Sequence, residues 1–416
     1  MIRCNSEADS KVWMEEDKIC FFILYSISIY LGINLKVFLL QKLLELIIFF
    51  IEVIILDYMK YALDLAKNGI GKVNPNPLVG AVIVKNNRII GEGWHEKYGG
   101  PHAEVNAFKS AAEDIRGADM YVTLEPCSHY GKTPPCAEAI AKSGIKRVFV
   151  GMKDPNPLVS GKGIEIIKNA GIEVICGVNE DECKALNPVF LKYITTKTPF
   201  VVMKSAMSLD GKIATHTGKS QWISSPQSRE AVQYMRKALK GIMVGINTVL
   251  EDNPHLTCRL ENSENPTKII VDSSLRVPEN ALIFEGLPNT KCIIAVAENY
   301  DREKAKSLKE RGVTIIEAPD NNNKVDLKAL MTALGEKDID GILLEGGGTL
   351  NFSALNSGIV DMVVSFISPM LIGGKNAKTP VEGQGFGEIS EAVRLKDVKL
   401  KEYYGDYIIY GRVGDN

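Results

Sequence analysis

The chain lacks a large net charge of either sign and any long run of basic residues. Its 416 residues include 49 Lys and Arg against 51 Asp and Glu, which gives a formal net charge of −2. Because a nucleic-acid-binding protein usually carries a basic surface, this balance argues against DNA or RNA as a partner. Small molecules are therefore the expected substrates.

Cysteines are few, and they do not follow the spacing of a disulfide-rich scaffold. Eight are scattered along the chain, which is typical of a protein from a reducing compartment, and we expect a cytoplasmic protein. Hydrophobic residues make up 45% of the sequence. A chain of this length and composition predicts two or three domains, each with its own core.

A clean membrane span and a signal peptide are also lacking in the apolar N-terminal extension, residues 1–56. Its first uncharged run, residues 19–35, only reaches the short end of what a spanning helix needs, and no small-residue cleavage site stands out. Three interpretations stay open: an anchor or interfacial helix, a buried helical extension, or translated sequence upstream of the true start. We favour the last, because globular patterning begins near Asp57. Membrane binding is expected only if residues 19–56 are a real anchor.

From Asp57 onward, apolar residues follow the periods of helices and strands. We expect a helix over 59–66 with Gly69 as its C-cap, strands over 78–84 and 88–93, a helix from His102 through Ala112, a strand over 120–124, a helix over 136–142 ending at Gly144, and a strand over 147–150. This order predicts a layered α/β domain over residues 57–198. A second α/β pattern begins near Phe200 and predicts another domain over 199–416.

One imidazole, two thiols and one carboxylate form a candidate metal site. His102 and Glu104 stand at an expected helix start, Cys127 follows a strand, and Cys136 stands at the start of another helix. Helix N-termini favour the thiolates that bind zinc. Three protein ligands leave a fourth position to water, as in catalytic zinc sites. We therefore expect one Zn²⁺ on His102, Cys127 and Cys136, with Glu104 carrying the proton in a hydrolytic deamination.

Several alternatives to this interpretation stay open. A structural zinc would need a fourth ligand, which His95 or His129 could supply. A non-enzymatic zinc module tethered to a membrane is a second alternative, and a nucleic-acid base deaminase with an unrelated second half is a third. The spacing of the two thiols is informative, because the usual deaminase pattern has two residues between its cysteines and this chain has eight between Cys127 and Cys136.

This long loop from Cys127 to Cys136, together with the segment Asn74 to Ala81, resembles the bifunctional deaminase/reductase family of riboflavin biosynthesis. The resemblance extends from about Asp57 to the end of the chain. It implies a cytidine-deaminase-like α/β/α layered domain followed by a dihydrofolate-reductase-like α/β domain, and a homo-oligomer. By the same resemblance, the deaminase substrate contacts Asn76, His95, His129 and Lys132. Taken by themselves, Lys132 could equally be a solvated loop lysine and His95 a structural histidine.

The resemblance also implies two reactions in succession. The first is the zinc-dependent hydrolytic deamination of 2,5-diamino-6-ribosylamino-4(3H)-pyrimidinone 5′-phosphate. The second is the reduction of the ribosyl group to a ribityl side chain by NADPH, which gives 5-amino-6-(5-phospho-D-ribitylamino)uracil.

The second half contains a glycine-rich turn after an expected strand, Ile342 to Leu344. Such a turn at a helix start can hold a phosphate on its backbone N–H groups, although it could also be a close packing turn. It lacks the G-x-G-x-x-G spacing of the Rossmann fingerprint. This turn and the segment Val201 to Ala214 resemble the family's reductase domain, which binds NADPH without that motif.

The resemblance further implies binding positions in this half. NADPH is expected at Ala206, Trp222, Thr248, Asp252, Ser273, Gly347, Gly348, Thr349, Leu350, Asn351, Phe352 and Ser353. The reductase substrate is expected at Ser220, Arg236, Leu256, Arg259 and Glu345. Arg236 and Arg259 can hold a sugar phosphate, and Glu345 can bind ribose hydroxyls. Either arginine could instead form a surface ion pair, and Trp222 could belong to the core.

Overall fold

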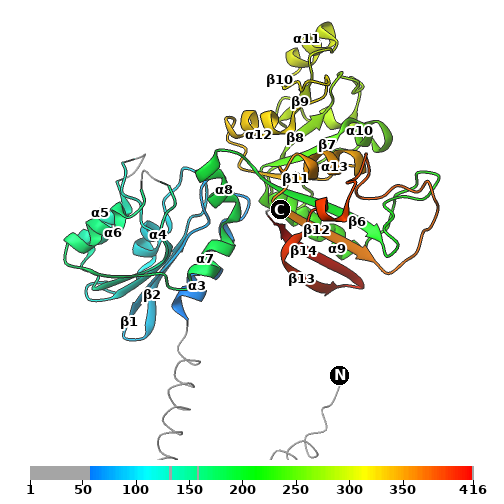
Figure 1. The fold of residues 1–416 in the computed structure, drawn as a ribbon. Helices are drawn as coiled ribbons and strands as arrows, with labels where there is room; N and C mark the ends of the chain where they lie inside the picture. Colours follow the sequence, from blue (N-terminus) through cyan, green and yellow to red (C-terminus); the bar gives the residue numbers. More distant parts are fainter. Residues whose placement is uncertain (1–56, 131–133, 157–158, 415–416) are drawn as a thin grey trace, which may run out of the picture. The chain divides into compact units, whose positions relative to one another are not determined.

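The computed structural model describes residues 57–130, 134–156 and 159–414. The N-terminal extension, and with it the choice among its three interpretations, lies outside these residues. No helix in the described ranges is long and apolar enough to cross a membrane. The described chain forms two β-sheets, one in each half of the sequence (Figure 1).

The first sheet has the strand order β2-β1-β3-β4-β5 within the described residues. Its strands are β1 (Gly80–Lys85), β2 (Arg88–Trp94), β3 (Asp119–Leu124), β4 (Arg147–Met152) and β5 (Glu173–Cys176). β1 pairs antiparallel with β2 and β3, whereas β3, β4 and β5 are parallel. The carboxyl ends of β3 and β4 therefore lie at the same edge, where a site can form.

Helices cover both faces of this sheet, as the sequence predicts (Figure 1). Their bounds are α3 (Tyr58–Ala66), the 3₁₀ turn η1 (Lys67–Gly69), α4 (Ala103–Ser110), α5 (Cys136–Ser143), α6 (Lys162–Asn169), α7 (Glu180–Leu186) and α8 (Pro188–Thr196). α4, α5 and α6 share one apolar core with the sheet, and α3, α7 and α8 share another. Each helix buries its apolar stripe and leaves its polar side to solvent.

Two helix ends differ from the sequence expectation. Gly69 does not cap α3, which ends at Ala66 and continues as the 3₁₀ turn. A Cβ at Gly69 would lie 2.7 Å from the carbonyl oxygen of His95, so this glycine serves a close approach of two backbones. Gly144, by contrast, caps α5 with φ 78°, as predicted.

The second sheet has the order β10-β9-β8-β7-β11-β6-β12-β14-β13 within the described residues. Its strands are β6 (Phe200–Ser208), β7 (Gly241–Gly245), β8 (Thr267–Val271), β9 (Cys292–Val296), β10 (Val313–Glu317), β11 (Gly341–Leu344), β12 (Met362–Ser368), β13 (Leu395–Tyr403) and β14 (Asp406–Val413). The pairs from β10 to β12 are parallel, whereas β14 is antiparallel to both β12 and β13. The parallel strands place their carboxyl ends along one edge.

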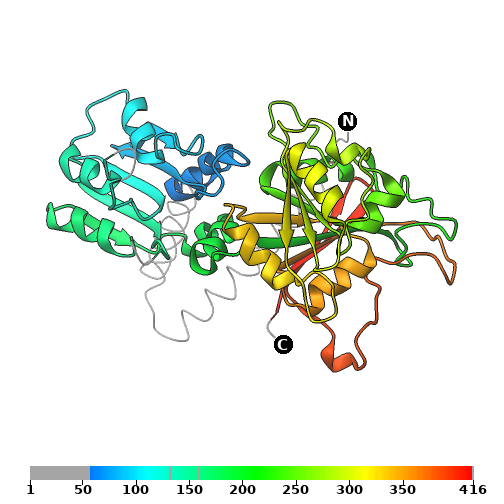
Figure 2. The same ribbon diagram turned by 90° about the horizontal axis from the view of Figure 1, so that it is seen from above.

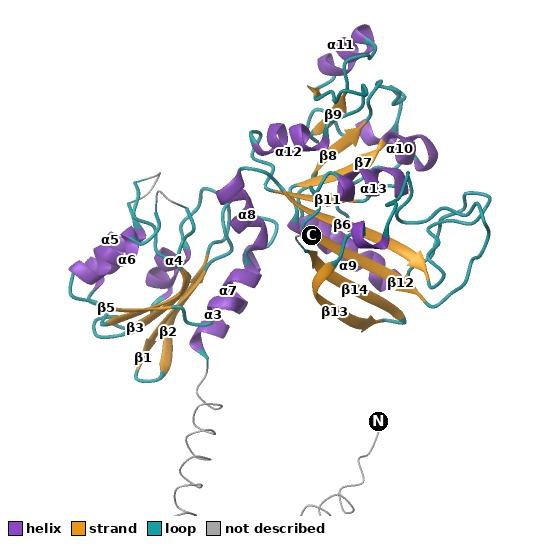
Figure 3. Ribbon diagram, in the orientation of Figure 1, coloured by secondary structure: helices purple, strands orange, loops and turns teal. Residues whose placement is uncertain are grey.

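Helices flank both faces of the second sheet (Figures 2 and 3). Their bounds are α9 (Pro226–Ala238), α10 (Ile246–Asp252), α11 (Arg302–Glu310), α12 (Leu327–Gly335) and α13 (Gly348–Asn356), with 3₁₀ turns η2 (Leu282–Phe284) and η3 (Ile389–Glu391). α12 and α13 pack in one apolar core. α10 and α11 pack in a second, and α9 in a third.

The start of α9 is fixed by its own sequence and by β14. Ser225 is the N-cap, its hydroxyl accepts a hydrogen bond from Ser228 N (3.2 Å), and Pro226 takes the first helical position. The carboxylate of Asp406, which is 2% exposed, accepts from Ser225 N (2.7 Å) and Ser228 Oγ (2.6 Å). Burial alone raises the pKa of Asp406, but these hydrogen bonds outweigh it and the pKa is lowered.

Candidate active sites

His102 and Glu104 meet at one point because the start of α4 lies between them. Two residues two apart do not share a face of a regular helix. His102, however, is the N-cap, with an extended backbone (φ −74°, ψ 166°), and is not the first helical residue that the sequence predicts. Glu104 is in the first helical turn and is buried. The change of backbone direction lets both side chains address the same space.

The three expected metal ligands gather at this helix start. His102 Nδ1 lies 3.5 Å from Cys127 Sγ and 3.4 Å from Cys136 Sγ. The backbone N–H of Cys136, the first residue of α5, donates to Cys127 Sγ over 3.3 Å. One ligand atom from each residue lies within 4.8 Å of the others. The eight-residue loop therefore brings the thiol of Cys136 next to the thiol of Cys127.

The donor set fits a zinc ion. Hydrogen bonds from Cys136 and His102 lower the pKa of the Cys127 thiol to about 4, which favours the thiolate that zinc needs. In the described part of the chain no fourth side-chain ligand joins the group. A structural zinc with four protein ligands is therefore disfavoured, and a three-ligand site open to water fits better.

Glu104 is placed to move a proton beside this group. Its side chain is 3% exposed, and burial is the main reason that its pKa is raised to about 6. Its Oε2 has no hydrogen-bond partner among the described residues. A buried carboxylate oxygen without a partner is costly unless a ligand or water completes it. The position of Glu104 therefore suits a proton carrier for a bound molecule.

His95 and Asn76, two of the expected substrate residues, form one hydrogen-bonded pair. His95 Nδ1 lies 3.0 Å from the carbonyl oxygen of Pro101, which can only accept, so Nδ1 carries the proton. Burial lowers the pKa of His95, and its Nε2 accepts from Asn76 Nδ2 over 3.1 Å. Both ring nitrogens are thus engaged, which argues against His95 as a fourth zinc ligand. The ring also stands edge-on to His102, with centroids 5.5 Å apart.

The other two expected substrate residues are less constrained. His129 is exposed on the loop between the two cysteines. Lys132 lies outside the described residues, so its role stays a prediction.

Glu125 is a residue of this site that the sequence analysis missed. Its buried carboxylate accepts from the backbone N–H groups of Asp154 (3.2 Å), Gly161 (3.0 Å), Gly163 (3.1 Å) and Ile164 (3.4 Å). It thereby joins the start of α6 to the loop that carries Cys127. The signal in the sequence is an acidic residue directly after a buried strand.

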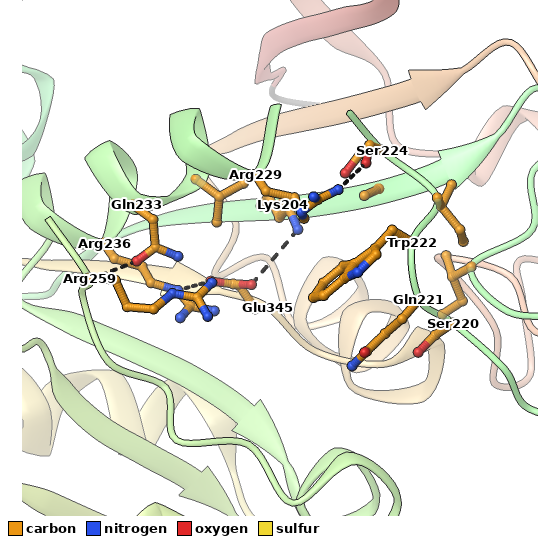
Figure 4. Close-up of a pocket in the computed structure, with 14 residues that line it drawn as sticks. Lys204, Ser220, Gln221, Trp222, Ser224, Arg229, Gln233, Arg236, Arg259 and Glu345 are labelled. Atoms are coloured by element: carbon orange, nitrogen blue, oxygen red, sulfur yellow. Dashed lines mark hydrogen bonds and ion pairs between the residues drawn. The ribbon is translucent and has the colours of Figure 1, made fainter. Parts of the chain in front are cut away.

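The second half contains a cavity of about 240 Å³ beside β6 and α9 (Figure 4). Four of the five expected substrate residues line it, namely Ser220, Arg236, Arg259 and Glu345. The fifth, Leu256, is buried in an apolar cluster with α10, so a role for its side chain at the cavity stays a prediction.

Glu345 stands at the centre of the charges in this cavity. Arg236 Nε donates to Glu345 Oε1 over 2.8 Å, and Lys204 Nζ lies 3.8 Å from Glu345 Oε2 (Figure 4). Burial alone raises the pKa of Glu345, but Lys204 and Arg236 outweigh it, and the pKa lies below its usual value. Lys204 also lines the cavity, and the sequence analysis gave it no role. Arg236 is thus in a partly buried ion pair at the cavity, not in a surface pair.

Trp222 is an exposed wall of the cavity, so the alternative that it belongs to the core is wrong. It is 61% exposed, and its indole lies against the guanidinium of Arg229, 4.4 Å from the ring centroid. Arg229 also donates to the carbonyl oxygen of Ser224 over 2.6 Å. Ala206, another expected cofactor position, lines the same cavity.

The glycine-rich turn meets the conditions for holding a phosphate. It joins β11 to α13, with Gly347 as the N-cap and no side chain capping the first helical N–H groups. A Cβ on Gly347 would meet nothing nearer than Thr248 Oγ1, at 3.7 Å. Leu350 and Asn351 are buried, so their side chains pack inside the protein. The open N–H groups fit the pyrophosphate of a dinucleotide such as NADPH.

Comparison with known proteins matches each half of the chain to a protein family. Residues 54–152 match the protein-family model described as the cytidine and deoxycytidylate deaminase zinc-binding region, and residues 199–409 match the RibD C-terminal domain. The chain is 49% identical over 354 residues to the riboflavin biosynthesis protein RibD of Actinobacillus pleuropneumoniae, covering 85% of this chain and 94% of that protein. The chain belongs to the RibD family. The RibD protein of Escherichia coli (strain K12) is 37% identical over 366 residues, 85% of this chain and 98% of its own.

Solved structures of the RibD family share the fold. Acinetobacter baumannii RibD superimposes with a TM-score of 0.77 at 38% identity, over 86% of this chain and 99% of that chain. A diaminohydroxyphosphoribosylaminopyrimidine deaminase/5-amino-6-(5-phosphoribosylamino)uracil reductase from Thermotoga maritima gives a TM-score of 0.73 at 40% identity, over 86% and 97%. The expected fold classes are thereby confirmed: a cytidine-deaminase-like first half and a dihydrofolate-reductase-like second half.

Proposed function

We propose that this chain catalyses two consecutive steps of riboflavin biosynthesis, a zinc-dependent deamination and an NADPH-dependent reduction. The first substrate is 2,5-diamino-6-ribosylamino-4(3H)-pyrimidinone 5′-phosphate, and the final product is 5-amino-6-(5-phospho-D-ribitylamino)uracil. The observation that carries the deaminase half is the group of His102, Cys127 and Cys136 beside the buried, unpartnered Oε2 of Glu104. Family membership supports both halves.

In the deamination, the protein residues bind the substrate and carry the proton. His102, Cys127 and Cys136 would hold a zinc ion, which would supply a polarised water for attack at the ring carbon that bears the amino group. Glu104 Oε2 receives the proton released by that water and delivers it to the departing ammonia. Asn76, oriented by the neutral ring of His95, presents its amide to the pyrimidine ring. His129 and Lys132 act on the substrate from the loop between the cysteines.

In the reduction, the cavity residues place the sugar against the cofactor. Arg236 and Arg259 hold the phosphate, and the ionised Glu345 accepts hydrogen bonds from ribose hydroxyls, while Ser220 and Leu256 complete the substrate positions. NADPH would be held by Ala206, Trp222, Thr248, Asp252 and Ser273, and the α13 turn would hold its pyrophosphate. Hydride transfer then depends chiefly on this placement.

The same proposal covers domains, compartment and partners. The deaminase domain occupies residues 57–198 and the reductase domain residues 199–416. The chain is a cytoplasmic homo-oligomer, and its partners are small pyrimidine ribose phosphates, with no nucleic acid among them. The near-neutral charge and the lack of a disulfide pattern support this view.

The deciding experiment follows ammonia and NADPH absorbance with purified full-length protein and the pyrimidinone phosphate. We expect ammonia release without NADPH, and NADPH oxidation once the deaminated product is present. Absence of ammonia release would show that the deaminase half of the proposed function is wrong. Absence of NADPH oxidation when the deaminated product is supplied would show that the reductase half of the proposed function is wrong.

A further inference from the structure

Trp222 is part of the cavity wall although most of it faces solvent. It is 61% exposed, and it lines the cavity together with the rest of the segment 220–224. This segment belongs to no helix or strand, so the hydrogen bonds of regular structure do not hold it. A large ring with few packing contacts is not fixed by its own surroundings. Another group therefore has to hold Trp222 if the wall is to keep its shape.

Arg229 holds this segment at two points. Its guanidinium lies over the indole of Trp222, with the Cζ atom 4.4 Å from the ring centroid. Its Nη1 donates to the carbonyl oxygen of Ser224 over 2.6 Å (Figure 4). Trp is the aromatic side chain that attracts a cation most strongly, and the planar guanidinium can stack on it while it donates in its own plane. One side chain thus fixes both a ring and a backbone carbonyl of the wall.

Arg229 is itself fixed by the start of α9. Its backbone N–H donates to the carbonyl oxygen of the N-cap Ser225 over 3.1 Å. The buried carboxylate of Asp406 in turn holds Ser225 and Ser228. The contacts of Arg229 therefore join a well-anchored helix to a segment without regular structure.

An ion pair does not account for the position of Arg229. No salt bridge of the described residues includes it. Glu345, the acidic side chain among the described residues that line the cavity, is already paired with Arg236 and Lys204. The described contacts of the Arg229 guanidinium are instead with Trp222 and Ser224.

We propose that Arg229 is a positioning residue of the reductase and acts through Trp222. This inference rests on the proposed function, because the same cavity is the place where NADPH and the sugar meet. The resemblance to the family gives Arg229 no role. A wall that is held in one orientation limits the orientations of the nicotinamide against the sugar carbon, and hydride transfer depends on that alignment. Loss of Arg229 therefore slows the reaction after both ligands are bound.

The first test is Arg229→Ala in the full-length chain, assayed by NADPH oxidation with supplied deaminated product. We expect kcat to fall about 10- to 100-fold at saturating NADPH, with KM for the deaminated product unchanged within about threefold. The KM is expected to hold because Arg236, Arg259 and Glu345 remain. Glu230→Ala, an exposed change at the next position of α9, is the matched control and should alter neither constant.

The second test combines Arg229→Ala with Trp222→Leu. We expect Trp222→Leu alone to lower kcat at least as much as Arg229→Ala does. If Arg229 acts through Trp222, the double variant should match Trp222→Leu within about twofold, because the interaction is already lost. A direct contact of Arg229 with the substrate would instead multiply the two effects and raise KM.

The outcomes separate this inference from the proposed function. If the unmodified chain does not oxidise NADPH with supplied deaminated product, the reductase half of the proposed function is wrong. If it does, the assignment of Arg229 is wrong when either single variant leaves kcat unchanged or when the two effects multiply. Urea titrations check that each variant is folded. Arg229→Gln, which keeps a donor for the carbonyl oxygen of Ser224, gives the same comparison if Arg229→Ala is unfolded.

Discussion

At the scale of single residues, the proposed chemistry depends on two carboxylates with opposite surroundings. Glu104 has an oxygen without a hydrogen-bond partner among the described residues, and its burial raises its pKa to about 6, so it can hold a proton near neutral pH. Glu345 is also enclosed, but Arg236 and Lys204 keep its pKa below the usual value. The same functional group is thereby a proton carrier in one site and a fixed anion in the other.

Exchanging each carboxylate for its amide should separate the two activities. Glu104→Gln removes the proton carrier, and we expect ammonia release to fall by about 10²- to 10⁴-fold. Its zinc content, measured by atomic emission, should stay unchanged because the three ligands remain. NADPH oxidation with supplied deaminated product should also stay unchanged.

Glu345→Gln is the matched variant in the other site. It should lower NADPH oxidation while ammonia release continues at the unmodified rate. Loss of zinc in Glu104→Gln would show a structural role for Glu104 and contradict its role as proton carrier.

Asp406 gives the reductase half a pH-dependent contribution to stability. Its pKa is lowered in the folded state, so it stabilises the fold above its unfolded pKa of about 3.9, and this contribution is lost as the pH falls through the folded pKa. We expect Asp406→Asn to lower the free energy of unfolding by about 1–3 kcal/mol at pH 7. The difference from the unmodified chain should shrink below pH 4, as measured by urea titrations. A difference that is constant between pH 7 and pH 3 would contradict this account.

At the scale of elements, helix starts build both sites. The N-cap of α4 carries His102, the first residue of α5 is Cys136, and the first turn of α13 forms the glycine-rich turn. The start of α6 is joined to the loop that carries Cys127 through the hydrogen bonds that Glu125 accepts. Close packing of these helix starts against the ends of the strands positions the side chains of each proposed site.

Gly163 in α6 shows how tight this contact is. A Cβ there would lie 1.9 Å from the carbonyl oxygen of Pro126, the residue before Cys127. We expect Gly163→Ala to displace Cys127, to weaken zinc binding by about 10- to 100-fold in a chelator competition, and to lower ammonia release accordingly. NADPH oxidation should be unaffected. Glu165→Ala, an exposed change on the same helix, is the control and should keep the zinc affinity of the unmodified chain.

The parts of each site that could be predicted from the sequence are those encoded over short distances. His102, Glu104 and the two cysteines stand at strand ends and helix starts that local patterning predicts. The role of Glu125 could not be predicted, because the backbone N–H groups that donate to its carboxylate, those of Gly161 and Gly163, are 36 and 38 residues away. Arg236 and Glu345 are 109 residues apart in the sequence. Their ion pair therefore could not be predicted without the three-dimensional structure.

Helix boundaries were predicted less well than strand positions, for two physical reasons. Gly69 was expected to end a helix, but its lack of a side chain serves contact with the backbone at His95, which sequence periodicity does not reveal. His102 was expected inside a helix, but the N-cap and the first helical residue differ only in backbone angles. Local patterns locate an element and leave its terminal residues undetermined.

At the scale of the whole molecule, each activity has its own sheet and its own cores. The proposed zinc ligands belong to elements around β3 and β4, whereas the cavity proposed for the reductase is built on β6, β11 and α9. The two reactions therefore share a chain without sharing the residues that perform them.

Removal of zinc should consequently affect one reaction only. After dialysis against 1,10-phenanthroline, we expect ammonia release to be lost and NADPH oxidation with supplied deaminated product to persist. Readdition of zinc should restore ammonia release. Loss of both activities after dialysis would show that the reductase depends on the metal site, which contradicts the separation described above.

The hydrogen bonds that Glu125 accepts have a consequence for metal selectivity. Because the protein itself holds the loop of Cys127, the two thiols stand ready before any ion arrives. A preformed pair of thiols is open to other soft cations as well as to zinc, because sulfur ligands bind cadmium and copper(I) readily.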